Sequence, residues 1–230
     1  MTNFWIWKGH KIAWHVEGEN KNAPIATLLI HGFGASKKHW RFNQKSISSI
    51  APCYAIDLIG FGESSQPKSQ LSYEKQHPNG FNYCFDNWSE QIIDFCKEII
   101  QNRVLLIGNS IGGVIALNTS KKISRICSAV ILIDCAQRTM DDKRLSEQSF
   151  IMRFLRPVIK TLVRQRFLSS TLFKNAARPT FIEKILKVAY PSQNNIDKEL
   201  IDILFKPTKR EGAPEAFRGF INLFNDHLAT

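Results

Sequence analysis

The sequence predicts an α/β fold, in which a mostly parallel, twisted sheet carries helices on both of its faces. The first observation is that short apolar runs recur along the first 135 residues, as expected for strands covered on both sides. The second is that segments with helical periodicity separate these runs, an alternation typical of parallel sheets. The third is a change after residue 135, where helical periodicity continues without a convincing strand.

The elements expected in the first half of the chain follow from local residue patterns. Apolar and polar residues alternate on both sides of Gly9, which predicts an antiparallel hairpin at one edge of the sheet. An apolar run then predicts a buried strand, and a helix and another strand follow it. The expected ranges are 4–8 and 12–16 for the hairpin, 26–30 for the next strand, about 36–50 for the helix and 53–56 for the strand after it.

The second half of the expected sheet begins after a polar, proline-containing loop. An amphipathic pattern predicts a helix behind this loop. The fifth strand then turns directly into another helix at Ser110, and the sixth strand ends at Asp134. The expected ranges are 65–80 for the loop, about 85–100 for the helix, 104–107 for the fifth strand and 129–133 for the sixth.

Composition favours one globular core with an additional lid, since the chain has 230 residues of which 43% are hydrophobic. The first residues lack the features of a signal peptide, and no apolar run is long enough to span a bilayer. We therefore expect a cytoplasmic protein. Five cysteines without a C-x-x-C pair indicate reduced, mostly buried thiols, and the sequence predicts no metal site and no cofactor.

The net charge of +11 is concentrated in the expected helical insertion. Residues 138–187 contain 12 lysines and arginines against 4 acidic residues, a difference of +8. Nucleic acid is the usual partner of so basic a chain. No nucleic-acid recognition motif is present, however, and we expect no such partner.

A basic amphipathic segment at 150–168 admits two interpretations. In the first, a lid helix packs on the core and leaves its basic face in solvent. In the second, the same helix makes a peripheral contact with an anionic membrane surface when the lid opens. The basic residues concerned are Arg153, Arg156, Lys160 and Arg164.

The pentapeptide at 108–112 has the pattern G-x-S-x-G and lies between an apolar strand and a helix-competent run. A serine at the tip of a sharp strand-to-helix turn has a strained backbone and an exposed hydroxyl. Gly108 and Gly112 have no side chains, so they avoid a collision where the chain doubles back. The helix N-terminus beneath Ser110 offers free N–H groups and partial positive charge to an oxyanion. This context is that of a nucleophile elbow.

Three motifs resemble the α/β-hydrolase superfamily, in its serine hydrolase branch, and the match covers nearly the whole chain. They are the stretch 31–34 (His-Gly-Phe-Gly), the supporting loop with Asp57, Gly60, Gly62 and Ser64, and the pentapeptide extended to Gly113. Within the superfamily they are most similar to pheophytinase-like esterases of cyanobacteria and plastids. The resemblance implies an α/β-hydrolase core at 1–137, a helical lid at 138–213, and a helix returning to the core at 214–230.

The resemblance also implies roles for individual residues. Ser110 is expected to be the nucleophile, and the backbone N–H groups of Phe33 and Ile111 to form the oxyanion hole. Gly32 and Gly34 are expected to keep the first loop close to the serine. A serine nucleophile implies acyl transfer, by hydrolysis of an ester, thioester or lactone. The substrate is expected to be a small-molecule ester with a large apolar acyl or alcohol group.

The expected acid and base are missing from their usual places. In this superfamily they follow strands that come after the lid, whereas the chain ends at Thr230 with six of eight strands expected. Asp134 is an alternative acid, although a strand-end capping residue is the simpler interpretation. His31 and His227 are the remaining candidates for the base.

Three hypotheses follow. The leading one is a truncated serine hydrolase of low activity, and its rival is a non-catalytic relative that binds a ligand under its lid. A third, a module that binds membrane surfaces or polyanions, rests only on the basic insertion.

Overall fold

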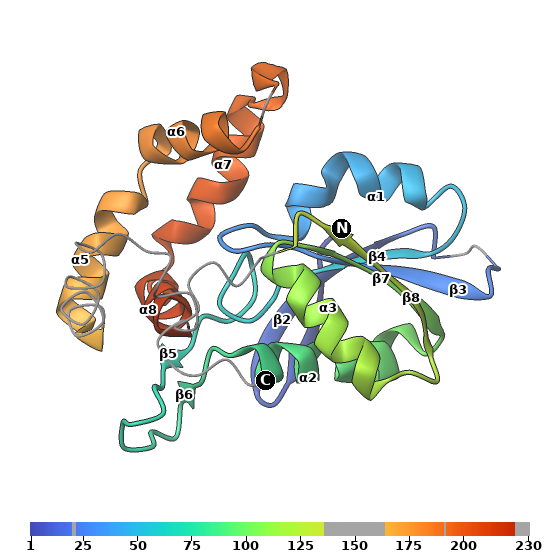
Figure 1. Ribbon diagram of the computed structural model, residues 1–230, viewed down its shortest axis with the longest axis horizontal. Helices are drawn as coiled ribbons and strands as arrows, with labels where there is room; N and C mark the ends of the chain where they lie inside the picture. Colours follow the sequence, from blue (N-terminus) through green and yellow to red (C-terminus); the bar gives the residue numbers. More distant parts are fainter. Residues whose placement is uncertain (20–21, 136–163, 191, 224–230) are drawn as a thin grey trace, which may run out of the picture.

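The structure confirms an α/β fold built on a mostly parallel sheet (Figure 1). In this computed structural model, residues 1–19, 22–135, 164–190 and 192–223 are described. The main sheet has the strand order β1-β2-β4-β3-β7-β8. The strands are β1 (Asn3–Trp7), β2 (His10–Glu17), β3 (Ile25–Ile30), β4 (Cys53–Ile56), β7 (Arg103–Asn109) and β8 (Cys127–Ile133).

The pairing explains why the central strands are apolar along their whole length. β1 and β2 form the antiparallel hairpin, whereas β4, β3, β7 and β8 are parallel to one another. Leu28 and Ile30 of β3 belong to the main hydrophobic core, and Leu29 between them belongs to a smaller cluster. Successive side chains of a strand point to opposite faces, so both faces of the sheet are covered.

Helices provide this cover on both faces (Figure 1). On one face lie the 3₁₀ turn η1 (Lys37–Trp40) and helix α1 (Arg41–Ile47), and Trp40 and Ile47 pack in the smaller cluster. On the other face, α2 (Phe85–Phe95) and α3 (Ile111–Lys122) pack against each other. Trp88 and Ile115 anchor these two helices in the main core.

Four α-helices of the described residues stand beyond one end of the sheet (Figure 1). Helix α5 (Arg166–Ala176) packs against α8 (Ala213–Leu223), and α6 (Pro179–Ala189) packs against α7 (Lys198–Phe205). This part of the expected insertion is helical, as its periodicity predicts. Residues 136–163, which include most of the basic segment at 150–168, lie outside the described residues, as do 224–230 with His227.

Three local features differ from the sequence-based expectations. The helix expected at about 36–50 begins as a 3₁₀ turn and ends at Ile47. The helix expected at about 85–100 changes to π geometry in η2 (Cys96–Ile100). The loop expected at 65–80 contains β5 (Lys68–Ser69), which pairs with β6 (Gly80–Phe81). Two-residue strands are too short to show a period, and for this reason the sequence did not predict them.

Strand β8 is the outer strand of the described sheet, and its apolar end is exposed. The side chains of Ile131, Leu132 and Ile133 are each at least 40% exposed. An apolar outer strand with free backbone groups favours pairing with another segment or another chain. No helix of the described residues is both long enough and apolar enough to cross a bilayer.

Candidate active site

Ser110 lies where β7 ends and α3 begins. Its backbone has φ 54° and ψ −119°, a positive φ that non-glycine residues rarely adopt. The Ser110 N–H donates to the carbonyl oxygen of Ile133 at 3.0 Å, and the Asn109 side chain donates to the same oxygen at 3.1 Å. The end of β8 therefore holds the turn in place. The strained strand-to-helix turn that the pentapeptide predicts is present.

The two glycines of the pentapeptide are required by close backbone contacts. A Cβ on Gly108 would lie 2.2 Å from the carbonyl oxygen of Gly112. A Cβ on Gly112 would lie 2.4 Å from the carbonyl oxygen of Ile30, at the end of β3. The steric reason expected from the sequence is thus present, but the collisions are with backbone atoms rather than between the two side chains.

The loop after β3 lies beside Ser110. A Cβ on Gly32 would lie 2.8 Å from the Asn109 Oδ1 and 3.1 Å from the Ser110 Cβ, so any larger residue would have to push these neighbours away. Gly34 has φ 69°, and an added Cβ would meet nothing within 4 Å, so glycine is needed there for its conformation alone. Phe33 stands between them, and Ile111 is the first residue of α3, where N–H groups have no partner within the helix. The structure thus brings these residues together around Ser110.

His31 has a structural position. Its side chain is fully buried, and the Leu58 N–H donates to its Nε2 at 3.0 Å. Nδ1 lies 2.7 Å from the carbonyl oxygen of Gly32, and we assign the proton to Nδ1 because Nε2 accepts. Burial lowers the pKa of His31, and a ring whose Nε2 accepts a hydrogen bond is neutral. Both ring nitrogens are engaged, so His31 joins two loops rather than activating Ser110.

Asp57 and Lys37 form a buried ion pair below these loops. The Lys37 side chain is only 3% exposed, and its Nζ lies 3.0 Å from Oδ2 of Asp57. It also pairs with Glu63. The Asp57 carboxylate accepts from the Lys37 N–H at 2.6 Å and from the Glu63 N–H at 2.8 Å. A Cβ on Gly62 would collide with this carboxylate, which confirms a supporting loop. Lys37 and Glu63 carry no sequence signal and were missed.

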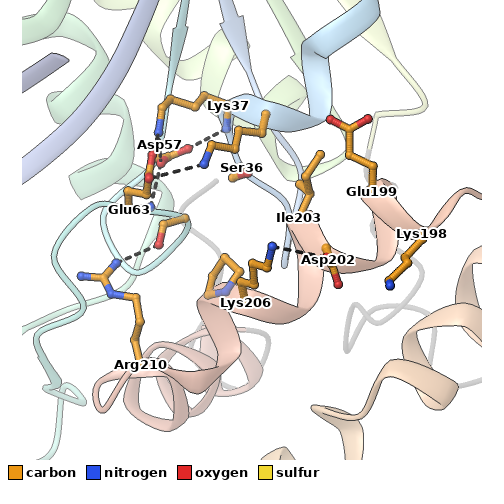
Figure 2. A pocket seen from close by; sticks show the side chains of 13 residues that line it. Ser36, Lys37, Asp57, Glu63, Lys198, Glu199, Asp202, Ile203, Lys206 and Arg210 are labelled. Atoms are coloured by element: carbon orange, nitrogen blue, oxygen red, sulfur yellow. Dashed lines mark hydrogen bonds and ion pairs between the residues drawn. The ribbon is translucent and has the colours of Figure 1, made fainter. Parts of the chain in front are cut away.

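A cavity of about 640 Å³ lies between this ion cluster, α7 and η5 (Lys206–Lys209) (Figure 2). Its charged wall residues are largely paired with one another or with the backbone. Lys206 lies 3.2 Å from Asp202, and Arg210 donates to the carbonyl oxygens of Gly62 and Ser64 at 2.7 and 2.6 Å. Ser110 does not line this cavity. The cavity is therefore held by ion pairs and is separate from the serine.

Aromatic side chains from α8 cover the loop that carries Phe33. The rings of Phe33 and Phe220 are stacked with centroids 3.7 Å apart, and Phe217 lies 6.4 Å from Phe33. Phe61 packs edge-on against the other side of Phe33 at 5.7 Å. A small cavity of about 50 Å³ between Phe33, Phe173 and Phe217 is mostly apolar. The surroundings of Phe33 therefore suit an apolar group.

The described residues do not bring an acid–base pair to Ser110. Asp134, which has φ 43°, follows β8 directly and is exposed. Its neighbour Cys135 packs against Gly113, so Asp134 lies near the start of α3. Among the described residues, no histidine nitrogen is hydrogen-bonded to Ser110, and His227 lies outside the described part of the chain.

Curated proteins match part of the chain. The chain is 32% identical over 130 residues to the 1-acylglycerol-3-phosphate O-acyltransferase ABHD5 of Sus scrofa, covering 56% of this chain and 35% of that protein. It is 28% identical over 116 residues to the (lyso)-N-acylphosphatidylethanolamine lipase of Homo sapiens, covering 50% of this chain and 31% of that protein. The chain thus spans about a third of the length of these two relatives.

Solved structures share the fold at low sequence identity. A membrane phospholipase A, described as a bacterial virulence factor, matches with TM-score 0.65 and 23% identity over 98% of this chain and 61% of that one. The serine hydrolase CarC of carbazole degradation matches with TM-score 0.67 and 17% identity over 97% and 69%. A haloalkane dehalogenase variant from Bradyrhizobium elkanii gives TM-score 0.71 and 15% identity over 97% and 69%.

A family profile described as alpha/beta hydrolase fold matches residues 26–171, which include both the loop after β3 and the turn at Ser110. The match spans more than half of the chain and agrees with the strand order and the strained serine. The chain belongs to the alpha/beta hydrolase fold family.

Proposed function

We propose that this chain carries the nucleophile and the oxyanion hole of a serine hydrolase that cleaves ester-type bonds, whether ester, thioester or lactone. The observation that carries the proposal is the backbone of Ser110, with φ 54° at the junction of β7 and α3. A strained serine between two sterically required glycines is the geometry of a nucleophile elbow. Strain of this kind persists where a function requires it.

The proposed chemistry is acyl transfer through a covalent intermediate. The Ser110 Oγ attacks the carbonyl carbon of the substrate, and a base accepts the hydroxyl proton, for which His227, outside the described residues, is the remaining candidate. The N–H groups of Phe33 and Ile111 donate to the oxyanion, aided by the positive end of α3. The tetrahedral intermediate collapses, the alcohol or thiol leaves with the proton, and water then hydrolyses the Ser110 ester.

We assign no base among the described residues, and Asp134 is the proposed acid. An oxyanion hole without its full triad still accelerates hydrolysis by about 10³–10⁴ over water. We therefore expect weak turnover from the 230-residue chain rather than none.

The proposed substrate is an ester with an apolar acyl or alcohol group. The rings of Phe217 and Phe220 on α8 cover the Phe33 loop, so α5–α8 would act as a lid over the substrate. Two of the relatives named above are an acyltransferase for 1-acylglycerol-3-phosphate and a lipase for an N-acylated phospholipid. Within this class of esterases, similarity to the pheophytinase-like enzymes remains a prediction from the sequence motifs.

The experiment is hydrolysis of p-nitrophenyl esters of increasing acyl length by the 230-residue chain and by Ser110→Ala. We expect slow hydrolysis that favours the longer acyl chains and falls at least tenfold in Ser110→Ala. Ser124→Ala, an exposed serine just after α3, is the matched control and should retain the rate. Equal rates for Ser110→Ala and the unchanged chain would contradict the proposal.

The rival function is non-catalytic binding of an apolar ligand beneath α8. It is favoured by the absence of a histidine contact with Ser110 among the described residues. In that case a fluorescent ester analogue would bind equally well to Ser110→Ala, no variant would hydrolyse it, and Phe217→Ser would weaken its binding.

A further inference from the structure

Helix α6 is apolar on two opposite sides, which a surface helix of a globular protein normally is not. On its inner side Leu186 is buried, with 5% of its surface exposed. On its outer side Phe181, Ile185 and Val188 are 43%, 52% and 85% exposed. The inner side packs on α7, and the outer apolar side has no cover within the described residues.

The three outer residues form one continuous stripe. They stand at i, i+4 and i+7, positions that share one face of a helix. At a rise of about 1.5 Å per residue, the stripe is about 10 Å long. We call these residues, Phe181, Ile185 and Val188, the α6 stripe. Figure 1 places α6 at the far end of the molecule from the sheet, so the stripe is not part of the domain core.

Exposed positive charge lies close to the α6 stripe along the chain. Lys184 lies between its members along the chain and is exposed, as are Arg178 at the start of the helix and Lys174 on α5. Residues 164–190 contain six lysines and arginines and one acidic residue, Glu183. Glu183 is already neutralised by Lys187 at 2.7 Å. An occupant of this surface must therefore be apolar and carry negative charge.

These properties distinguish between possible occupants. A second copy of the chain would bring two basic surfaces together, each on a protein of net charge +11. A protein partner normally buries anchor residues in pockets, and neither cavity described above is lined by a residue of α6. Apolar and aromatic side chains surrounded by lysines and arginines are typical of helices that lie in a membrane interface.

We propose that the α6 stripe docks on the surface of an anionic lipid bilayer, with the stripe inserted at the headgroup level and Lys184, Arg178 and Lys174 against the lipid charges. The stripe is independent of the Ser110 chemistry, so this proposal and the proposed function stand or fall separately. The surface differs from the basic segment at 150–168, most of which lies outside the described residues.

The test is sedimentation of the full chain carrying Ser110→Ala with two kinds of vesicle. One kind is pure phosphatidylcholine, and the other contains phosphatidylglycerol as about a third of its lipid. We expect binding to the anionic vesicles at low salt, little binding to the neutral ones, and release at high salt because the charges are exposed.

Two variants separate the apolar and the charged contributions. Phe181→Ser combined with Ile185→Ser should weaken binding about tenfold or more, since both side chains lose apolar contact with lipid. Lys174→Gln combined with Lys184→Gln should weaken binding about fivefold for each lysine at low salt. The altered side chains are exposed, so circular dichroism should show an unchanged fold.

Matched controls alter equally exposed residues elsewhere. Ile6→Ser combined with Ile50→Ser removes two apolar side chains that are 65% and 81% exposed, and Lys97→Gln combined with Lys121→Gln removes two exposed charges. Both controls should bind as the unchanged chain does. Equal binding of the α6 variants and the controls would overturn the proposal. Absence of sedimentation with both kinds of vesicle would also overturn it. A dimer in solution that is dissociated only by Phe181→Ser combined with Ile185→Ser would do the same.

Discussion

Replacement of Gly108 by alanine tests the steric basis of the turn at Ser110. The new Cβ would lie 2.2 Å from the carbonyl oxygen of Gly112 and 2.6 Å from the amide nitrogen of Gly113. Real Cβ atoms essentially never approach closer than 3.0 Å, so β7 and α3 must separate by about 3.0 − 2.2 = 0.8 Å. Both contacts are with backbone, which cannot rotate away as a side chain does.

The expected cost follows from this overlap. Overpacking of a tight site costs about 1–3 kcal/mol, and we expect about 3 kcal/mol for Gly108→Ala because no flexible group can yield. The assay is urea unfolding followed by tryptophan fluorescence, together with the rate of ester hydrolysis. The hydrolysis rate should fall even in the folded fraction, since a shift of this size misplaces the Ser110 hydroxyl relative to the Phe33 loop.

Gly9→Ala is the informative control. Gly9 has φ 78° and nothing within 4 Å of its added Cβ, so the substitution adds conformational strain without a collision. It should cost about 1 kcal/mol and leave hydrolysis unchanged. If Gly108→Ala unfolds at the same urea concentration as the unchanged chain and hydrolyses esters equally fast, the close packing of β7 on α3 does not determine the turn.

Three further predictions concern the groups beneath the turn. Asp57→Asn should cost about 3 kcal/mol in urea unfolding, because it leaves the buried Lys37 cation with half of its partners; a loss below 1 kcal/mol would contradict the buried pair. His31→Asn should lower stability but keep Ser110-dependent hydrolysis within about twofold per folded molecule; loss of hydrolysis in a folded variant would make His31 the base. Burial alone raises the pKa of Glu63, but the hydrogen bond and charge of Lys37 outweigh it and lower the pKa to about 2. The stability from this pair is therefore present above pH 4.5 and lost as the pH falls from 4.5 towards 2, so acid unfolding of Glu63→Gln should be shallower there, and an unchanged profile would argue against the pair.

Much of the fold could be predicted because its signals are local. The apolar runs and their glycine-containing ends mark the strands of the sheet, and β4 (Cys53–Ile56) matches its expected range of 53–56. The turn at Ser110 could be predicted because its close backbone contacts require glycine at two fixed positions, two residues before and two residues after the serine. The five-residue motif is therefore sufficient to predict the sharp strand-to-helix turn.

The remaining features depend on contacts between distant segments. Nothing local distinguishes Lys37, which is buried, from Lys38, whose side chain is 53% exposed. Its burial depends on Asp57 and Glu63, which arrive from another loop. The stacking of Phe220 on Phe33 joins residues far apart in the chain, and no periodic pattern encodes such a pair. The outward α6 stripe was likewise missed, because periodicity alone does not tell which apolar face of a helix is covered.

Covalent labelling of Ser110 tests the central claim most directly. The 230-residue chain is treated with a fluorophosphonate, which reacts with activated serine hydroxyls, and peptide mass spectrometry then locates the adduct. We expect one adduct, on the peptide that contains Ser110, and none on Ser110→Ala. Absence of labelling at Ser110 in the folded chain, or equal labelling of exposed serines such as Ser124, would contradict the claim that Ser110 is the nucleophile.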